Sequence, residues 1–490
     1  MKLCILGGGG FRTPYVYQAL LRDTGSPRVD EVALYDVDEA RLHTMMAILT
    51  ELAAGFPDAP RLVPTTDLRR AVEGSDFVFA ALRVGGLEGR RCDEHVALDL
   101  NVLGQETTGP GGLAYAIRTV PVMVEAAKAI KELAPGAYVM NFTNPAGIIT
   151  EAMQSVLGDR VLGICDTPSG LGRRVAGLLG LDHERVQMDY VGLNHLGWMR
   201  RVLYDGRDIL PELMADDALL GALEEGHVFG TDWIRTLGSV PNEYLYYYYF
   251  NRDAVRAIID SGKTRGDFLA DSQSDFYARA ASAASGVADL WRSTVERRSA
   301  SYMAEAKGGT QDAPTHVKER ETDPAHQGYA GVALGVMAAI SRNERQTMIL
   351  NVRNGGTIHG LPDDAVVEVP TLVDANGVHP LTTAQPDLHQ IGLMSQVKAV
   401  ERHTIAAALT GSTREAVAAF ALHPLVDSVT VARSLVAGYI DRIPVVAAVL
   451  TKSRTLQRGR DPPSRARARG VSRPLCPRQN ASGRAKSTPA

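Results

Sequence analysis

The chain has 490 residues, of which 45% are hydrophobic and 22% charged, so it is typical of soluble globular proteins and unlike disordered or fibrous ones. Its four cysteines are scattered without framework spacing, which favours a reducing, cytoplasmic setting over export. No apolar run reaches bilayer length, and a net charge of -4 hides a basic segment on an acidic body, so neither a membrane nor nucleic acid is an expected partner.

The first 185 residues alternate short apolar runs with amphipathic stretches, which is the pattern of βαβ units. The predicted strands are Lys2–Leu6, Glu31–Tyr35, Phe77–Ala81, Tyr138–Phe142 and Val161–Ile164. The predicted helices are Pro14–Arg22, Glu39–Ala54 and Leu113–Leu133. Residues 1–185 are therefore expected to form a Rossmann-like α/β domain with a doubly wound parallel sheet.

Beyond residue 185 the pattern predicts a second, mixed α+β lobe, which we place at 186–452. Its predicted elements are the strands Gln187–Leu193, Arg200–Tyr204, Met348–Val352 and Ala365–Val369 and the helical stretches Phe268–Arg298 and Gln390–Ala421. The remaining segment, 453–490, carries ten Arg or Lys against the single Asp461 and is rich in Pro and Ser. It is expected to be a disordered basic tail, with an RNA-binding arm as the alternative.

The glycine run Gly7, Gly8, Gly9 and Gly10 follows the first predicted strand directly and precedes a helix. Backbone amides and a helix N-terminus can approach a pyrophosphate there without obstruction by Cβ atoms, although a tight turn is the alternative. Asp36 ends the second strand, where a carboxylate accepts hydrogen bonds from ribose hydroxyls and repels a 2′-phosphate. The sequence thus predicts NAD rather than NADP, with Asp38 as a competing carboxylate.

Several polar segments follow predicted strands, where ligands bind in open α/β sheets. They are Arg83–Arg90, Gly104–Gly112, Asn141–Pro145, Cys165–Pro168 and Gly192–His195. The thiol of Cys165 and the imidazole of His195 could share a divalent metal and leave coordination positions for substrate. On the residues alone, a buried Cys and a hydrogen-bonded core His are the favoured interpretation.

These segments, in this order, resemble glycoside hydrolase family 4, the NAD- and manganese-dependent glycosidases, over roughly residues 1–450. The most specific matches are RVGGLEGR at Arg83–Arg90, GQET at Gly104–Thr107, NFTNPA at Asn141–Ala146, CDTP at Cys165–Pro168 and GLNHL at Gly192–Leu196. The family usually places Ser or Thr after its glycine run, whereas this chain has Phe11, so contacts to the cofactor phosphates are expected to differ.

The resemblance implies that Cys165 and His195 bind Mn²⁺ or another divalent transition metal. It also implies a redox route to bond cleavage: NAD⁺ oxidises C3 of the sugar, the C2 proton is removed, the C1 group is eliminated, water adds, and the ketone is reduced again. Tyr244 matches the family's base and Asp166 is expected to protonate the leaving oxygen, while Tyr246–Tyr249 keep the choice of tyrosine open.

Arg90 and Arg265 match family arginines that would bind a 6-phosphate, and Asn144 is expected to bind the sugar. The residues after Cys165 group with the phosphoglucosidases of the family, and the stretch that begins at Arg83 together with Asn194-His195-Leu196 favours a 6-phospho-β-glucosidase, although Asp166 is shared with the α-acting members. A 6-phospho-α-glucosidase, a plain NAD-dependent dehydrogenase and a catalytically inactive sensor remain alternatives. The resemblance also implies a homodimer or homotetramer.

Overall fold

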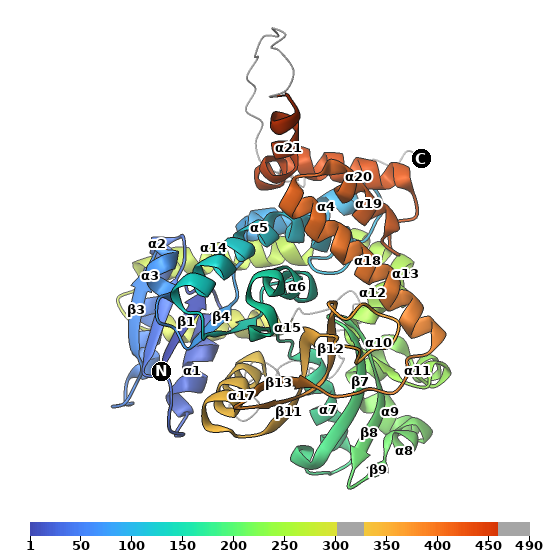
Figure 1. Cartoon of the computed structure of the whole chain (residues 1–490), viewed down its shortest axis with the longest axis horizontal. Coiled ribbons are helices and arrows are strands. Elements are labelled where there is room, and N and C mark those ends of the chain that lie inside the picture. The colour runs from blue at the N-terminus through green and yellow to red at the C-terminus, as the bar shows by residue number, and fades with distance from the viewer. Residues whose placement is uncertain (301–327, 459–490) are drawn as a thin grey trace, which may run out of the picture.

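The structure, a computed structural model, describes residues 1–300 and 328–458 (Figure 1). Its strands are β1 (Lys2–Leu6), β2 (Glu31–Tyr35), β3 (Arg61–Thr65), β4 (Phe77–Ala80), β5 (Tyr138–Asn141), β6 (Val161–Gly163), β7 (Val186–Leu193), β8 (Leu196–Tyr204), β9 (Arg207–Asp208), β10 (Val240–Pro241), β11 (Gln346–Arg353), β12 (Val366–Asp374) and β13 (Gly377–Pro380).

The helices alternate with these strands in the first half and dominate the second. They are α1 (Thr13–Arg22), α2 (Glu39–Ala53), α3 (Leu68–Val72), α4 (Gly86–Leu98), α5 (Pro110–Leu133), α6 (Ala146–Leu157), α7 (Thr167–Leu178), α8 (Leu210–Ala215), α9 (Asp217–Ala222), α10 (Glu224–Phe229), α11 (Thr231–Leu237), α12 (Tyr246–Tyr249), α13 (Asn251–Ser261), α14 (Arg265–Ser282), α15 (Val287–Ala300), α17 (Gly328–Arg342), α18 (Leu388–Thr410), α19 (Thr413–Leu422), α20 (Val429–Arg442) and α21 (Pro444–Arg458).

The described strands form one continuous sheet. Its N-terminal part runs β3-β2-β1-β4-β5-β6 with every pair parallel, the order of a dinucleotide-binding sheet. The sheet then continues through β11, β12, β7, β8 and β10 with antiparallel pairs. This confirms the predicted Rossmann-like α/β class with a mixed second part, and it places both parts on one sheet.

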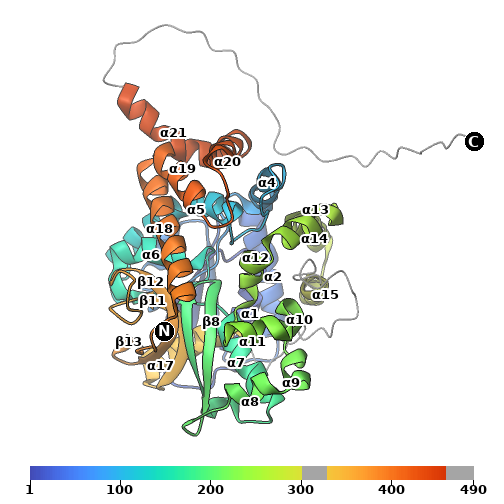
Figure 2. The ribbon, with the colours of Figure 1, turned by 90° about the vertical axis from the view of Figure 1, so that its right-hand side faces the viewer.

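Alternating side chains of β1 divide the core into two layers, because successive residues of a strand point to opposite faces. Leu3 and Ile5 pack with α1, α2 and α17, whereas Cys4 and Leu6 pack with α5, α6 and the C-terminal helices. In Figure 2 the helices α18, α19 and α20 lie above and beside α5 and α6, consistent with their shared layer. The C-terminal helices therefore pack on the helices α4, α5 and α6.

The structure corrects the predicted elements at three places. The strand β3 was not predicted, because Pro64 and exposed side chains hide an edge strand in the sequence. The predicted stretch Phe268–Arg298 is two helices, separated where Gly286 takes φ +76 and where Glu51 of α2 accepts hydrogen bonds from three amides at the start of α15. Likewise, Gly411 ends α18 with φ +71, so the stretch Gln390–Ala421 is also two helices.

The C-terminal helix α21 continues past the predicted boundary at 452 to Arg458, and residues 459–490 of the predicted tail lie outside the described residues. Within the described part of the chain, no single helix has the length and apolarity to span a bilayer. The bent pair α20–α21 is long and apolar enough only when its two helices are counted together.

Candidate active site

The glycine run forms a tight loop at the end of β1. Gly7 has φ +93, and both Gly7 and Gly8 donate their amides to the carbonyl oxygen of Tyr35 at 2.9 and 2.7 Å. A Cβ on Gly7 would lie 2.7 Å from the carbonyl oxygen of Ala81, and one on Gly8 would lie 2.9 Å from Leu34. Only glycine fits this approach of β1 to its two neighbouring strands.

The structure separates the roles of the two competing carboxylates. Asp36 accepts the Gly9 amide at 3.0 Å, so its side chain lies against the glycine loop. Asp38 instead caps α2 by accepting the amide of Arg41 at 3.1 Å. Asp36 is therefore the carboxylate placed at the predicted ribose position, and a side chain on Gly9 would collide with it at 2.9 Å.

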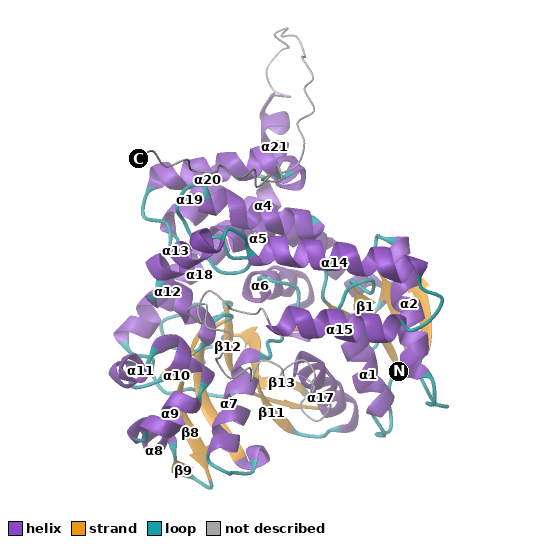
Figure 3. Cartoon of the chain, turned by 180° about the vertical axis from the view of Figure 1, so that it is seen from behind, coloured by secondary structure: helices purple, strands orange, loops and turns teal. Residues whose placement is uncertain are grey.

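Two helices from the second half cover the glycine loop, and Figure 3 shows α14 and α15 beside α1 and α2. Tyr277 of α14 donates to the carbonyl oxygen of Gly9 at 2.7 Å, and Trp291 of α15 donates to that of Phe11 at 3.2 Å. Phe11 itself is buried against Phe276, with ring centroids 4.7 Å apart. The departure from the family's Ser or Thr at position 11 thus serves packing between the two halves of the chain.

His195 is presented by a tight turn between β7 and β8. Leu193 pairs with Leu196, so Asn194 and His195 make a two-residue hairpin loop, and His195 adopts φ +62. Its ring is 9% exposed and lies 3.7 Å from the ring of Tyr244 in a stacked arrangement. Burial lowers the pKa of His195 to about 4 against the opposing effect of nearby Glu243 and Glu106, so the imidazole is neutral at pH 7.

The hydrogen bonds around His195 fix which ring nitrogen carries the proton. Gln105 Oε1 accepts the amides of Thr107 and Thr108, both at 2.6 Å, so this atom is the oxygen. The Thr107 hydroxyl donates to the same oxygen at 3.1 Å and must therefore accept from His195 Nδ1 at 3.2 Å. The proton lies on Nδ1, which leaves the lone pair of Nε2 for a ligand.

The residues at the start of α7 meet those around Tyr244. Thr167 donates its hydroxyl to the carboxylate of Glu243 at 3.3 Å, and Glu243 directly precedes Tyr244, which stacks on His195. The structure thereby brings the segment Cys165–Thr167 together with the predicted base and the predicted ligand His195. Of the tyrosines left open by the sequence, Tyr244 contacts His195, whereas Tyr249 accepts a hydrogen bond from Trp198 instead.

Cys165 is a buried, free thiol at the end of β6. Burial raises its pKa well above the usual value, and the negative charges of Glu368 and Asp166 raise it further. A buried thiol beside two carboxylates ionises readily only when a cation is close. Because His195 offers a neutral nitrogen, this donor set fits a divalent transition metal, with no third Cys, His, Asp or Glu completing a cluster among the described residues.

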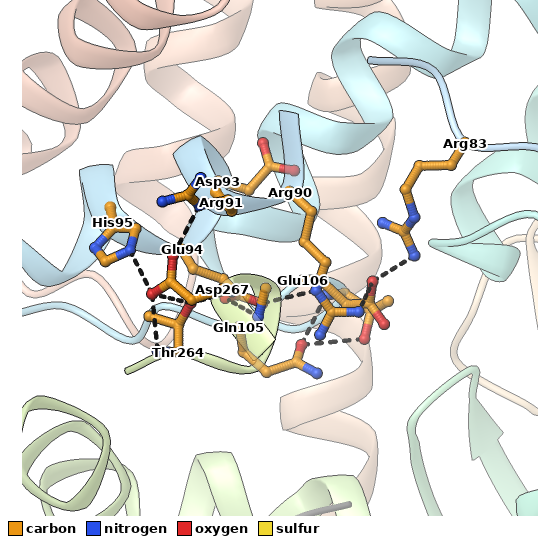
Figure 4. A network of polar contacts seen from close by, with 12 residues as sticks. Arg83, Arg90, Arg91, Asp93, Glu94, His95, Gln105, Glu106, Thr264 and Asp267 are labelled. Atoms are coloured by element: carbon orange, nitrogen blue, oxygen red, sulfur yellow. Dashed lines mark hydrogen bonds and ion pairs between the residues drawn. The ribbon is translucent and has the colours of Figure 1, made fainter. Parts of the chain in front are cut away.

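A second cluster joins two predicted segments, Arg83–Arg90 and Gly104–Gly112, around α4 (Figure 4). Glu106 pairs with both Arg83 and Arg90, and Arg90 also donates to Glu94 at 2.9 Å. Although burial alone would raise it, the pKa of Glu106 is held at about 2 by Arg83 and Arg90. Arg90 is only 5% exposed, so it enters this cluster as a buried, paired guanidinium.

Arg265 begins α14, whose first turn docks onto α4. The Gly266 amide donates to Glu94 at 2.7 Å, and Asp267 accepts from Arg91 at 2.8 Å and contacts His95 at 2.9 Å. Arg265 donates to the carbonyl oxygen of Arg298 at 2.7 Å. This docking brings the chain at Arg265 next to the helix that carries Arg90.

Asn144 lies in the loop after β5, half-buried. The neighbouring Asn141 anchors this loop by donating to the carbonyl oxygens of Thr143 and Ala146 and to the hydroxyl of Thr150. A cavity of about 30 Å³, space for one or two water molecules, adjoins the loop. Its lining includes Pro145, Gly147, Asn194, His195 and Glu401.

The chain is similar in sequence to known proteins over most of its length. Residues 2–181 match the Family 4 glycosyl hydrolase family, and residues 190–426 match its C-terminal domain. A probable 6-phospho-beta-glucosidase of Bacillus subtilis is 30% identical over 448 residues, 89% of this chain and 94% of that protein. The chain belongs to glycoside hydrolase family 4. Its members act on glycosides, and the similar proteins are named for 6-phosphorylated ones.

Two further comparisons bear on this family 4 chain. A 6-phospho-alpha-glucosidase of Leptotrichia buccalis is also 30% identical, over 90% of this chain and 97% of that protein. The solved 6-phospho-beta glucosidase of Thermotoga maritima, which contains manganese, NAD⁺ and glucose-6-phosphate, is 27% identical with a TM-score of 0.75 and covers 90% of this chain and 98% of that one. Identity to β- and α-acting relatives is therefore equal, and it does not separate the two anomers.

Sequence reasoning missed several residues that shape this site. Thr107 and Gln105 lie in the singled-out GQET segment, but only the structure shows that they orient His195. Glu243 is adjacent to the predicted base and reaches Thr167. Glu368, more than 170 residues beyond His195 in the chain, accepts a hydrogen bond from Asn194, and no motif pointed to it.

Proposed function

We propose that this family 4 hydrolase cleaves 6-phosphorylated β-glucosides by the oxidation, elimination, hydration and reduction route. The observation that carries the proposal is the stacking of Tyr244 on His195 at 3.7 Å, with Glu243 bonded to Thr167 beside Cys165 and Asp166. These contacts support a site in which the expected base, acid and metal ligands lie close together and the glycine loop with Asp36 holds the dinucleotide.

Two groups bound from outside are required. Bound NAD⁺ supplies a reversible hydride acceptor for C3, and a divalent cation such as Mn²⁺ supplies Lewis-acid polarisation of the sugar oxygens at C2 and C3. The residues that fit the dinucleotide are the glycine loop and Asp36. Those that fit the cation are Cys165 through its thiolate and His195 through Nε2.

The proton transfers fall to residues of this chain. Tyr244, acting as the phenolate, takes the proton from C2 and becomes the neutral phenol, and its ring is held in place by the buried imidazole of His195. Asp166 precedes the first turn of α7 and gives a proton to the departing glycosidic oxygen. Asn144, in the loop anchored by Asn141, donates to a sugar hydroxyl.

We assign binding of the 6-phosphate of the substrate to the arginine cluster. Arg83 and Arg90 pair with Glu94 and Glu106, the charge of Arg298 also acts on Glu106, and Arg265 donates to the carbonyl oxygen of Arg298. Arg90 uses Nε for Glu94 and Nη1 for Glu106, whereas the buried Nη1 of Arg83 has no hydrogen-bond partner among the described residues and is available to a phosphate oxygen. An excess of guanidinium groups at a partly exposed site suits a dianion.

The proposed preference for the β-anomer rests on matches of single residues and short segments to the family. The stretch Arg83–Arg90 and the sequence Asn194-His195-Leu196 resemble the β-acting members, whereas Asp166 is shared with the α-acting ones. The 6-phospho-α-glucosidase is therefore the second candidate.

The test is an assay of paired 4-nitrophenyl α- and β-glucoside 6-phosphates with NAD⁺ and Mn²⁺, and with the unphosphorylated β-glucoside as control. We expect release of nitrophenol from the phosphorylated β-substrate, dependent on both NAD⁺ and Mn²⁺, with no net NADH. Preference for the α-substrate would correct the anomer. Stoichiometric accumulation of NADH without nitrophenol would instead identify a dehydrogenase and refute the hydrolase.

A further inference from the structure

Glu368 occupies the middle of the sheet where its two halves join. It lies on β12, opposite Asn351 of β11 and Gly192 of β7. Asn351 is in turn opposite Gly163 of β6, so a row of register partners runs from β7 to β6 across Glu368. The side chain of Glu368 is fully buried, with 0% exposure.

Three hydrogen bonds hold this carboxylate, and every donor is neutral. Tyr190 donates its hydroxyl to Oε2 at 3.1 Å, and the amides of Asn194 and Asn351 donate to Oε1 at 3.2 and 2.9 Å. Among the other buried glutamates of the described chain, Glu94, Glu225 and Glu401 each pair with a cationic side chain. No Arg or Lys among the described residues pairs with Glu368. A buried carboxylate with neutral donors alone is costly unless a cation approaches it.

The three hydrogen bonds connect Glu368 to the segments that carry both expected metal ligands. Asn194 directly precedes His195 in the hairpin turn. Asn351 faces Gly163, and a Cβ on that glycine would lie 2.8 Å from the Cβ of Asn351, so β6 is packed tightly against this residue just before Cys165. The negative charge of Glu368 also acts on the Cys165 thiol.

We propose that Glu368 is a positioning residue for the divalent cation: it fixes the Asn194–His195 turn relative to β6 and supplies the negative charge that offsets the ion. The inference rests on the proposed function. A divalent cation bound by one thiolate and one neutral imidazole keeps one positive charge, and the buried carboxylate of Glu368 neutralises it. In a low-dielectric interior such an uncoordinated carboxylate strengthens cation binding, as outer-shell carboxylates do in other metal sites.

The test is Glu368→Gln, which keeps the size and the acceptor oxygen for the two asparagines but removes the charge. Mn²⁺ affinity is measured by the paramagnetic resonance of free Mn²⁺, and Co²⁺ is used as a second probe through its thiolate charge-transfer absorption. We expect Mn²⁺ to bind about 10- to 100-fold more weakly, with unchanged NAD⁺ affinity, because removal of outer-shell partners has effects of that size. A variant that binds Mn²⁺ as tightly as the wild type would overturn the inference.

Two controls keep the result specific. Glu225→Gln removes another fully buried carboxylate, one paired with Arg174, and is expected to leave Mn²⁺ affinity unchanged. Glu368→Asp retains the charge and must bind Mn²⁺ more tightly than the glutamine variant does. If the glutamine variant does not fold, the aspartate variant decides alone: an aspartate variant that folds but does not bind Mn²⁺ refutes the charge assignment. If the wild type itself binds no Mn²⁺, the proposed function fails. If the wild type binds Mn²⁺ and the Glu368 variants bind it equally tightly, only this inference fails.

Discussion

Replacing Glu106 by Gln should destabilise the chain strongly at neutral pH and clearly less at pH 3. Glu106 pairs with Arg83 and Arg90, and its side chain is 16% exposed. Glutamine keeps a hydrogen-bond acceptor in place but leaves two guanidinium groups around a neutral amide. The loss of stability therefore reports on the charge of Glu106 and not on its packing.

The expected size follows from the pKa of Glu106, which falls from 4.5 to about 2 on folding. Such a difference corresponds to about 3 kcal/mol of stabilisation of the ionised carboxylate. Because the folded-state pKa is the lower one, this stabilisation is complete above pH 4.5 and is lost as the pH falls from 4.5 toward 2. The wild type and the glutamine variant should therefore converge in stability at low pH.

The assay is urea-induced unfolding followed by tryptophan fluorescence between pH 7 and pH 3, with the free energy compared at each pH. Glu132→Gln is the matched control, because Glu132 also pairs with an arginine, Arg69, but is 61% exposed. An exposed pair contributes at most about 1 kcal/mol, so this control should differ little from the wild type. A Glu106 variant that is as stable as the wild type at pH 7, or whose deficit is the same at pH 3, refutes the reasoning.

Three other substitutions address the site. Cys165→Ser should abolish the thiolate-to-Co²⁺ absorption and weaken Mn²⁺ binding by at least about tenfold while urea unfolding is nearly unchanged, and full activity in a chelator would contradict it. Tyr244→Phe should slow exchange of the substrate C2 proton with D₂O, seen by NMR, by at least about 100-fold, and undiminished exchange would remove the tyrosine as base. Gly9→Ala should raise the Kd for NAD⁺, measured by calorimetry, because the added Cβ meets Asp36 at 2.9 Å; equal affinity would place the dinucleotide elsewhere.

The sequence predicted the parallel half of the fold closely because its strands are short, fully buried runs between amphipathic helices. Local pattern failed where contacts from far along the chain decide the structure. The break before α15 depends on Glu51, which lies more than 230 residues earlier and accepts its first amides. The strand β3 is recognisable only from its pairing with β2, since its own residues are half-exposed and include a proline.

The same limit applies to the site. Motifs identified Cys165, His195, Asp36 and Tyr244, and the structure brings their segments to the expected edge of the sheet or glycine loop. The motifs were less informative about Arg90, because a sequence shows that a residue is charged but does not show which residues it pairs with. Here Glu106 follows 16 positions later, after a turn that returns the chain to α4, and it pairs with the arginine.

The charges of the site are separated in a way that fits a phosphorylated sugar. Near Cys165 the carboxylates of Glu368 and Asp166 gather, and this negative end favours a divalent cation. Near Glu106 the guanidinium groups gather, and this positive end favours a phosphate. His195 lies close to Glu243 and Glu106, whose negative charges each act on its pKa. A substrate that places two hydroxyl oxygens at one end and a dianion at the other matches that polarity, whereas an unphosphorylated glucoside matches only half of it.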